Sequence, residues 1–453
     1  MPSVYIKTYG CQMNERDSEA VAASFIRRGY ALARSEAVAD VVLLNTCSVR
    51  DQAERKAVGK MRTLAAEVRR HRPHVLLGFL GCMAQSRGEE LVRDVPGVRL
   101  VLGTQKFHRA GELVDELLAG RRKTICEVGE EAGSEREIRD HVLNLAGEPR
   151  SVTAFVSIMQ GCNQHCTFCI VPHTRGRERS RSIAEIVEEC RGLVARGVRE
   201  ITLLGQIVTS YGRREIGERD GLSAFVQLLE AVNAVEGLER IRFTSPHPKG
   251  YGDDLIAAYG SISKLCTSAH IPVQSGSDRV LRAMHRGYTR ERFLEIVRKL
   301  RAVRPDVGLS TDLIVGFPGE TEADFEETLG LAREAAFDAA FVFKYSPRRQ
   351  TAAAEMDGQL PKEVIEARHA RLLDLINEIA TDRYAALVGR KVEVLVEGPS
   401  RRNPERLEGR TSCNKIVVFD GAPQQVGAVV PLRIGRASNV TLYGDPVSHL
   451  DEN

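Results

Sequence analysis

Residues 161–169 read Gly161-Cys162-Asn163-Gln164-His165-Cys166-Thr167-Phe168-Cys169, and this run guides the interpretation of the whole chain. Three cysteines this close together offer thiolates, which suit an iron–sulfur cluster. A four-iron cluster with three protein ligands keeps one iron open, and an open metal position favours substrate chemistry over a structural role. The alternative is a zinc site, with His165 or His173 as the fourth ligand.

The composition is typical of a multi-domain enzyme from a reducing compartment. A chain of 453 residues is long for one domain. Ten cysteines without an evident signal peptide favour metal ligation over disulfides. No apolar run approaches the length of a membrane span, so we expect a cytoplasmic protein with no membrane segment. The net charge of +3 does not by itself indicate nucleic-acid binding.

The N-terminal part repeats one pattern three times. Strand candidates at 4–8, 41–45 and 75–80 are each followed by a cysteine and then by a helix. This alternation predicts a parallel sheet, and the carboxyl ends of its strands form one rim where ligands bind. Three thiolates on that rim can hold a second cluster, and the alternative is three unrelated buried cysteines. The candidate ligands are Cys11, Cys47 and Cys82.

The chain from about residue 148 to 380 continues the alternation of strands and helices. Six such units in a row favour a partial (β/α) barrel, whose active site lies at the carboxyl ends of the strands. The cysteine run directly follows the first strand candidate, which places it on that face. The strand candidates are 152–158, 200–204, 240–245, 269–273, 309–315 and 340–344.

Three further strand ends have the composition of ligand-binding loops. Glycine there permits close approach of the backbone to a ligand, and polar side chains supply oriented hydrogen bonds. Together the loops indicate a nucleoside pocket, although each glycine alone could mark a turn. Thr321 and Asp324 resemble a capping box that opens the next helix. The candidate contacts are Gln206, Gln274, Ser275, Gly276, Asp312 and Gly316.

Arginines occupy every second position from Arg175 to Arg181. In extended backbone they would all point one way, which suits a phosphate or carboxylate partner. The alternative is a solvated charged loop in which Glu178 is a partial neutraliser.

The last part of the chain changes character near residue 382. Short strand candidates separated by turns predict a small antiparallel barrel of the OB type, a shape often used to bind nucleic acid. Basic and acidic residues nearly balance there, so the charges support RNA binding weakly. The strand candidates are 391–397, 407–412, 415–419, 429–434 and 440–443, and the candidate RNA contacts of the chain are Arg175, Arg177, Arg401, Arg402 and Arg410.

Along its whole length the sequence resembles the radical S-adenosylmethionine (SAM) methylthiotransferases. The likeness rests on Cys169–Glu178, Pro272–Asp278, Arg286–Thr289, Thr311–Thr321 and Gly409–Thr411 with Asn414. The order of parts is also that of the family. The expected domains are an N-terminal open α/β domain at 1–120, a linker at 121–147, a radical SAM core at 148–380 and a TRAM domain at 381–449.

The resemblance implies two [4Fe–4S] clusters and SAM as cofactors. It implies that the N-terminal cysteines hold an auxiliary cluster, while Cys162, Cys166 and Cys169 hold the cluster that binds SAM. SAM would both methylate sulfur and yield the 5′-deoxyadenosyl radical, which removes hydrogen from carbon 2 of a tRNA adenine. The favoured substrate is N6-(dimethylallyl)adenosine at position 37. Threonylcarbamoyl adenosine or a ribosomal-protein aspartate is the alternative.

Beyond the cluster ligands we expect no catalytic residue. An electron donor such as flavodoxin or ferredoxin and a monomeric state are also expected. A non-enzymatic iron–sulfur or zinc protein that binds RNA is the alternative of another class. Two cysteine triads, each one ligand short of a closed site, speak against that alternative.

Three places depart from the family pattern and concern the substrate side of the site. Ile207 follows Gln206 where asparagine is usual, and His173 stands where tyrosine is usual. Arg349 and Gln350 interrupt the expected Arg-Pro-Gly-Thr. All six candidate cluster ligands are present.

Overall fold

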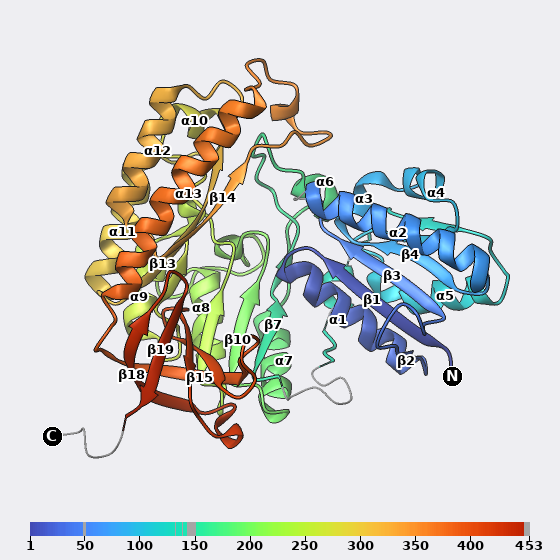
Figure 1. The fold of residues 1–453 in the computed structure, drawn as a ribbon, viewed down its shortest axis with the longest axis horizontal. Helices are drawn as coiled ribbons and strands as arrows, with labels where there is room; N and C mark the ends of the chain where they lie inside the picture. Colours follow the sequence, from blue (N-terminus) through green and yellow to red (C-terminus); the bar gives the residue numbers. More distant parts are fainter. Residues whose placement is uncertain (49–50, 132, 138, 143–150, 448–453) are drawn as a thin grey trace.

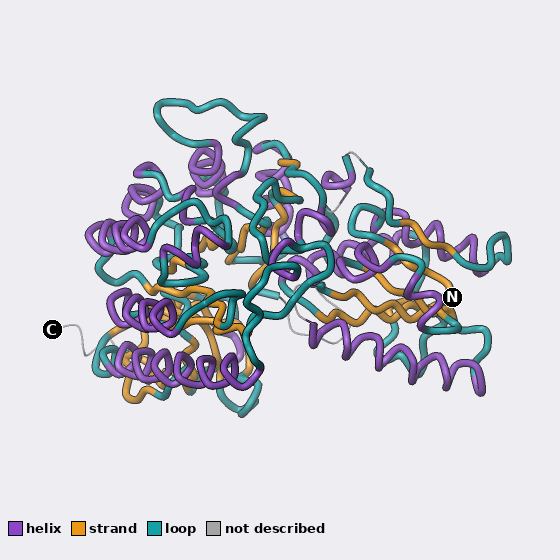
Figure 2. Tube along the Cα trace, turned by 90° about the horizontal axis from the view of Figure 1, so that it is seen from above, coloured by secondary structure: helices purple, strands orange, loops and turns teal. Residues whose placement is uncertain are grey.

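The computed structural model describes the chain except residues 49–50, 132, 138, 143–150 and 448–453. Figure 1 shows the N-terminal domain on the right, a larger barrel on the left and a small β-barrel below it. Figure 2, seen from above, shows the helices of the larger barrel grouped on its outer side. Among the described residues, no helix is long and apolar enough to cross a membrane.

The N-terminal domain is built on a six-stranded sheet whose paired strands are all parallel, as predicted. Its central strands are runs of buried valine and leucine, because helices cover both faces. The spatial order is β2 (Ala31–Leu32), β1 (Ser3–Tyr9), β3 (Val41–Thr46), β4 (Leu76–Leu80), β5 (Val98–Leu102) and β6 (Ile125–Glu127). The sequence patterns did not indicate β2, β5 or β6, and β6 lies in the stretch expected as a linker.

Separate apolar cores lie on the two faces of this sheet. Helices α1 and α5 contribute to one core, and α2, α3 and α4 contribute to the other. The bounds are α1 (Gln12–Arg27), α2 (Asp51–His71), α3 (Cys82–Arg87), α4 (Glu90–Asp94) and α5 (Ala110–Leu118).

The central domain is a partial barrel of six parallel strands in chain order, as predicted. Two three-stranded sheets meet where Ile241 bridges to Leu265. The strands are β7 (Thr153–Ser157), β10 (Glu200–Leu204), β11 (Arg240–Phe243), β12 (Ser268–His270), β13 (Gly308–Val315) and β14 (Ala339–Lys344). Two short strands, β8 (Met159–Gln160) and β9 (Arg179–Ser180), pair beside the cysteine run.

Seven helices cover the outside of this partial barrel and enclose the largest apolar core. In α7, a capping box between Ser182 and Glu185 starts the helix, and Cys190 lies in the apolar core. The bounds are α7 (Ile183–Ala195), α8 (Ala224–Asn233), α9 (Asp253–Ser261), α10 (Asp278–Ala283), α11 (Arg290–Val303), α12 (Glu322–Ala335) and α13 (Lys362–Ala385). Strand β7 forms one edge of the arc, and α1 of the N-terminal domain lies beside it (Figure 1).

The C-terminal domain is a closed five-stranded barrel in the order β15-β16-β17-β19-β18. The expectation of an entirely antiparallel barrel is wrong at one pair, because β17 and β19 run parallel. A closed ring with an odd number of strands cannot alternate in direction all the way round. The bounds are β15 (Lys391–Pro399), β16 (Leu407–Thr411), β17 (Ile416–Phe419), β18 (Val429–Ala437) and β19 (Thr441–Pro446).

The small barrel packs against the amino-terminal ends of the central strands, opposite the face that carries the cysteine run (Figure 1). Arg240 donates to the carbonyl oxygen of Arg410 at 2.6 Å. Arg242 donates to the carbonyl oxygen of Thr411 at 2.8 Å. The two domains are thus joined by arginines that satisfy backbone carbonyls.

A buried ion pair strengthens this junction. The ammonium group of Lys415 contacts the carboxylate of Asp338, and both side chains are buried. Arg383 donates to the same carboxylate at 3.2 Å, and the Lys415 nitrogen lies 4.9 Å from the Tyr384 ring centroid. Burial alone would raise the pKa of Asp338, but these two cations hold it below its usual value.

Replacing Lys415 with alanine should lower the free energy of unfolding by about 3 kcal/mol, because it leaves a buried carboxylate with one cation fewer. The contribution is present above about pH 4 and is lost as the pH falls toward the lowered pKa of Asp338. Urea unfolding followed by circular dichroism measures both effects. The control Arg402→Ala, at an exposed position, should change stability by less than about 0.5 kcal/mol. Equal effects of the two substitutions would contradict the assigned role.

Candidate active site

The cysteine run is held at the carboxyl end of β7 by backbone geometry and by one glutamine. Gly161 has a φ of +83°, and a Cβ there would lie 1.9 Å from the carbonyl oxygen of Arg177, so only glycine fits. The Gly161 amide donates to the side-chain oxygen of Gln206 at 2.6 Å. Gln206, predicted to contact SAM, therefore also positions the loop that carries the three thiols.

Arg286 joins this loop to the next strand ends, a contact that the sequence patterns did not reveal. Its guanidinium is buried, lies 3.4 Å from the Cys166 sulfur and donates to the carbonyl oxygen of Pro272 at 3.0 Å. It also donates to the hydroxyl of Tyr288 at 3.0 Å. The only sequence signal was the Arg-Gly-Tyr-Thr motif, which indicated family but no role.

The protein environment of the run disfavours free thiolates. Burial raises the pKa of Cys162 to about 12 and that of Cys169 to about 11. A coordinating metal deprotonates such thiols outright. This donor set therefore fits a group that brings its own positive charge.

The strand ends after β12 and β13 bring several predicted contacts together. Gln274 has a φ of +73°, and its amide donates to the carbonyl oxygen of Asp312 at 2.9 Å. Ser275 is fully buried and lies 3.4 Å from the hydroxyl of Thr328. Asp312 lies 3.6 Å from His270 across the two strands.

The expectation that Gly276 and Gly316 open the backbone to a ligand is corrected by the structure. A Cβ on Gly276 would lie 2.5 Å from the Cα of Thr328 in α12. A Cβ on Gly316, whose φ is +77°, would lie 2.5 Å from Ile365 in α13. In both positions the missing side chain makes room for a helix.

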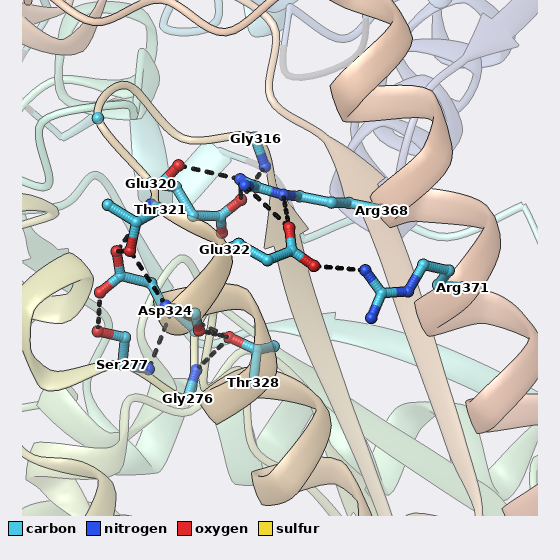
Figure 3. Close-up of polar contacts among 12 residues, drawn as sticks. Gly276, Ser277, Gly316, Glu320, Thr321, Glu322, Asp324, Thr328, Arg368 and Arg371 are labelled. Atoms are coloured by element: carbon cyan, nitrogen blue, oxygen red, sulfur yellow. Dashed lines mark hydrogen bonds and ion pairs between the residues drawn. The ribbon is translucent and has the colours of Figure 1, made fainter.

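Buried carboxylates fix these loops against α12 and α13 (Figure 3). Asp324 accepts from the Ser277 hydroxyl at 2.6 Å and from the Thr321 amide at 2.8 Å, which confirms the predicted capping box. Glu320 accepts from the Gly316 amide at 2.8 Å and from Arg368 at 2.7 Å. The network rigidifies the loop that carries Gln274 and Ser275.

Two phenylalanines on β14 were not predicted as site residues. Phe341 pairs in register with Asp312 and is 55% exposed, and its ring stacks on Phe343 with centroids 6.5 Å apart. Ala340 and Val342 face the apolar core, so Phe341 and Phe343 lie on the opposite, inner face of the arc. The exposed ring of Phe341, backed by the half-buried Phe343 and beside a carboxylate, offers a stacking surface for a base.

The N-terminal cysteines lie where the sequence predicted, each just past the carboxyl end of a strand. Cys11 precedes α1, Cys47 follows β3, and Cys82 begins α3. Asn14 donates to the side chain of Asn45 at 3.2 Å beneath them, and both residues are fully buried.

The three thiols share one electrostatic neighbourhood. A hydrogen bond with Cys47 lowers the pKa of Cys11 to about 6, and the charge of Arg175 acts in the same direction. Burial raises the pKa of Cys82, and Arg175 opposes that shift. The structure therefore brings Cys11, Cys47 and Cys82 together around one cation.

That cation comes from the central domain. Arg175 ends α6 (Val171–Arg175), the short helix that follows Cys169, and is 2% exposed. It donates to the buried carboxylate of Asp17 in α1 at 2.6 Å, and its second terminal nitrogen has no hydrogen-bond partner among the described residues. The expectation that Arg175 contacts RNA is wrong, because the side chain is enclosed between two domains.

The expectation of an arginine row from Arg175 to Arg181 is also wrong. Only two residues of this stretch are extended, because α6 and a turn precede them. Arg179 pairs with Glu135 at 3.0 Å and Arg181 with Glu189 at 2.6 Å, while Arg177 is exposed. On the small barrel, Arg401 and Arg402 are exposed and Arg410 pairs with Glu397 at 3.3 Å.

The donor arrangement does not suit a single metal ion. Within the described part of the chain, no group of three or more His, Cys, Asp or Glu side chains is placed to hold one ion. His165 and His173, the candidate fourth zinc ligands, are both exposed. A four-iron cluster binds each thiolate through a different iron, so it accepts a wider spacing than one ion does. The hydroxyl oxygens of Thr46 and Ser48, next to Cys47, are buried without partners and could face such a group.

Comparisons with known proteins match each part of the chain. Residues 156–332 match the radical SAM superfamily, and residues 385–447 match the TRAM domain. Residues 3–103 match a family described as Uncharacterized protein family UPF0004.

One solved structure with a similar fold is the radical SAM methyltransferase TsrM from Kitasatospora setae, with a TM-score of 0.59. It shares 14% identity, and the match covers 78% of this chain and 77% of that one. Likeness at this identity concerns the fold alone.

Relatives of known name match the chain from end to end. A tRNA-2-methylthio-N(6)-dimethylallyladenosine synthase from Opitutus terrae is 54% identical over 98% of this chain and 97% of its own length. A protein of the same name from Akkermansia muciniphila is 52% identical over 98% of this chain and 99% of its own. This chain therefore belongs to the radical SAM family of tRNA-2-methylthio-N(6)-dimethylallyladenosine synthases.

Proposed function

We propose that this enzyme adds a methylthio group to carbon 2 of N6-(dimethylallyl)adenosine at position 37 of tRNA. The observation that carries the proposal is the pair of cysteine triads, linked by the short segment in which five residues separate Cys169 from Arg175. The names of relatives that match the chain over its full length support this choice of substrate. When bound, two [4Fe–4S] clusters and SAM would supply the electron, the hydrogen-abstracting radical, the sulfur and its methyl group.

The central triad would hold the cluster that binds SAM. Gln206 positions its loop, and the guanidinium of Arg286 stabilises negative charge on Cys166. Gln274, Ser275 and Asp312 would bind SAM at the neighbouring rim. The exposed face of Phe341 would stack on an adenine ring.

The N-terminal triad would hold the auxiliary cluster that delivers sulfur. Arg175 would stabilise the negative charge of the three N-terminal thiolates. Its ion pair with Asp17 would also hold the N-terminal domain, which carries this cluster, against the central domain. Arg175 acts through the cluster ligands and is therefore a positioning residue.

The partners follow from this chemistry. We infer an electron donor such as flavodoxin or ferredoxin, a monomeric enzyme and a cytoplasmic location, where tRNA is present.

The substrate is tested by incubating the reconstituted enzyme with SAM, a reductant and tRNA that carries dimethylallyladenosine, threonylcarbamoyladenosine or unmodified adenosine. We expect a methylthio product only from the dimethylallyl form, detected by mass spectrometry of the nucleosides. A product from the threonylcarbamoyl form alone would overturn the proposed substrate.

The two triads should separate by function. Wild-type enzyme should bind about eight irons per chain, and replacing Cys11, Cys47 and Cys82 with alanine should halve this number. That variant should still produce 5′-deoxyadenosine but no methylthio nucleoside, whereas replacing Cys162, Cys166 and Cys169 should abolish both products. Iron analysis and chromatography of the products measure these outcomes. Methylthio product from the first variant would show that its cluster is structural.

Loss of the Arg175 charge should shift the reduction potential of the auxiliary cluster to more negative values, because the cation stabilises the added electron. Arg175→Gln is combined with Asp17→Asn so that no lone buried carboxylate remains. Both changes are made in a variant that lacks the central triad, so that only one cluster is observed. A redox titration followed by electron paramagnetic resonance gives the midpoint. The control is Arg177→Gln, and equal midpoints in both variants would contradict the role.

A further inference from the structure

A groove of about 570 Å³ lies between the N-terminal domain and the central barrel. Helices α2 and α3 form one wall, and the chain after β14 forms the other; Figure 1 shows this orange segment extending toward α6. Ile170, the residue after Cys169, also lines it, so the groove opens beside the cysteine run. We call it the arginine groove.

The lining of the arginine groove is rich in positive charge, which Glu90 and Asp94 partly neutralise through Arg87 and Arg349. Five lining side chains are guanidinium groups and one is a carboxylate. Guanidinium groups suit phosphate because their planar forks bind it through two hydrogen bonds. The residues are Arg55, Arg62, Arg87, Arg348 and Arg349, with Glu54 as the acid.

Packing against the described protein does not explain a glycine in the middle of α2. Gly59 lies four residues after Arg55 and three before Arg62, so all three share one face of the helix. Glycine at such a position costs about 0.5–1 kcal/mol relative to alanine. A Cβ on Gly59 would meet no atom within 4 Å, so nothing within the described protein requires its absence. The bare backbone instead leaves room for a ligand to lie along the helix.

One arginine on each wall of the groove already has a carboxylate partner. Arg349 binds Glu90 of α4 at 2.7 Å, but the arginine side chain is 65% exposed, and such a pair contributes little stability. Arg87 of α3 binds Asp94 at 2.5 Å, and its Nε atom lies 3.8 Å from Glu90. Phosphate oxygens would compete with these two carboxylates for the guanidinium groups, and the exposed Arg349 pair is the weaker competitor.

We propose that the arginine groove binds the phosphates of anticodon-loop nucleotides of tRNA and so holds the target base beside the cysteine run. The proposal rests on the tRNA function proposed above. The small barrel packs at the other end of the central strands, away from the cysteine run.

The test measures binding of a fluorescent anticodon stem-loop RNA to the full-length holoenzyme at several salt concentrations. The double variant Arg62→Gln with Arg348→Gln should bind about tenfold more weakly for each arginine, the equivalent of one charge-assisted hydrogen bond. Its slope of log affinity against log salt should fall by about 0.7 for each lost contact to single-stranded RNA. Gly59→Leu should weaken binding while thermal stability stays equal or rises.

The matched control is Arg298→Gln on α11, whose exposed side chain lies on the outer side of the barrel. It should leave affinity and salt slope unchanged. Production of 5′-deoxyadenosine without RNA should be the same in all variants. Weaker binding by the groove variants alone supports the proposal.

Two results would overturn the proposal while leaving the methylthiotransferase function intact. One is wild-type RNA affinity and salt slope in both groove variants. The other is normal RNA binding together with slower turnover on reduced flavodoxin but not on dithionite, which would make the groove a protein-docking site. Absence of methylthio product from the wild-type enzyme would instead reject the proposed function itself.

Discussion

An ion pair from which water is excluded joins the two halves of the proposed active site. Arg175 and Asp17 come from different domains, and neither side chain reaches solvent. Separating them would leave two uncompensated charges in a medium of low polarity, which costs several kcal/mol. The relative position of the N-terminal sheet and the central barrel is therefore restricted at the point where the N-terminal cysteines lie.

The contacts between the central barrel and the small barrel also consist of buried cations, most of which bind neutral backbone carbonyls. Arginines at the start of β11 bind backbone carbonyls of the small barrel, and Lys415 binds Asp338. Buried hydrogen bonds cross each junction, so relative motion of the domains would break them as well as the packing. Because the small barrel packs at the opposite ends, it does not cover the carboxyl ends of the central strands, where a substrate would bind.

Sequence periodicity was sufficient to predict the architecture because the strands are either fully buried or alternate regularly. All six central strands and the three cysteine-bearing strand ends were predicted in this way. Periodicity missed three strands of the N-terminal sheet. Strands β2 and β6, with two and three residues, are too short to show a period. Strand β5 is a short buried run, and periodicity alone does not distinguish such a run from a buried helix segment. The prediction for Gly276 and Gly316 was wrong. In a sequence, a glycine that makes room for a helix cannot be distinguished from one that makes room for a ligand.

Charged side chains were the least predictable part of the site. The arginines from Arg175 to Arg181 looked alike, yet one is enclosed between domains and another is exposed. What separates them is the position of their partners: Asp17 and Glu135 are far away in the sequence, and Glu189 lies in the helix that follows Arg181. Pairing over such distances depends on the tertiary fold and leaves no local pattern.

The short connection through α6 has a consequence for how such an enzyme can change. The five-residue helix α6 spans most of the interval from Cys169 to Arg175. The distance between the central cysteine run and the N-terminal cysteines is therefore set by the covalent geometry of this segment. Inserting even one residue would rotate Arg175 away from Asp17, since each helical residue turns the chain by about 100°. The length of this segment is therefore as restricted as the identity of its cysteines, whereas surface loops elsewhere can lengthen freely.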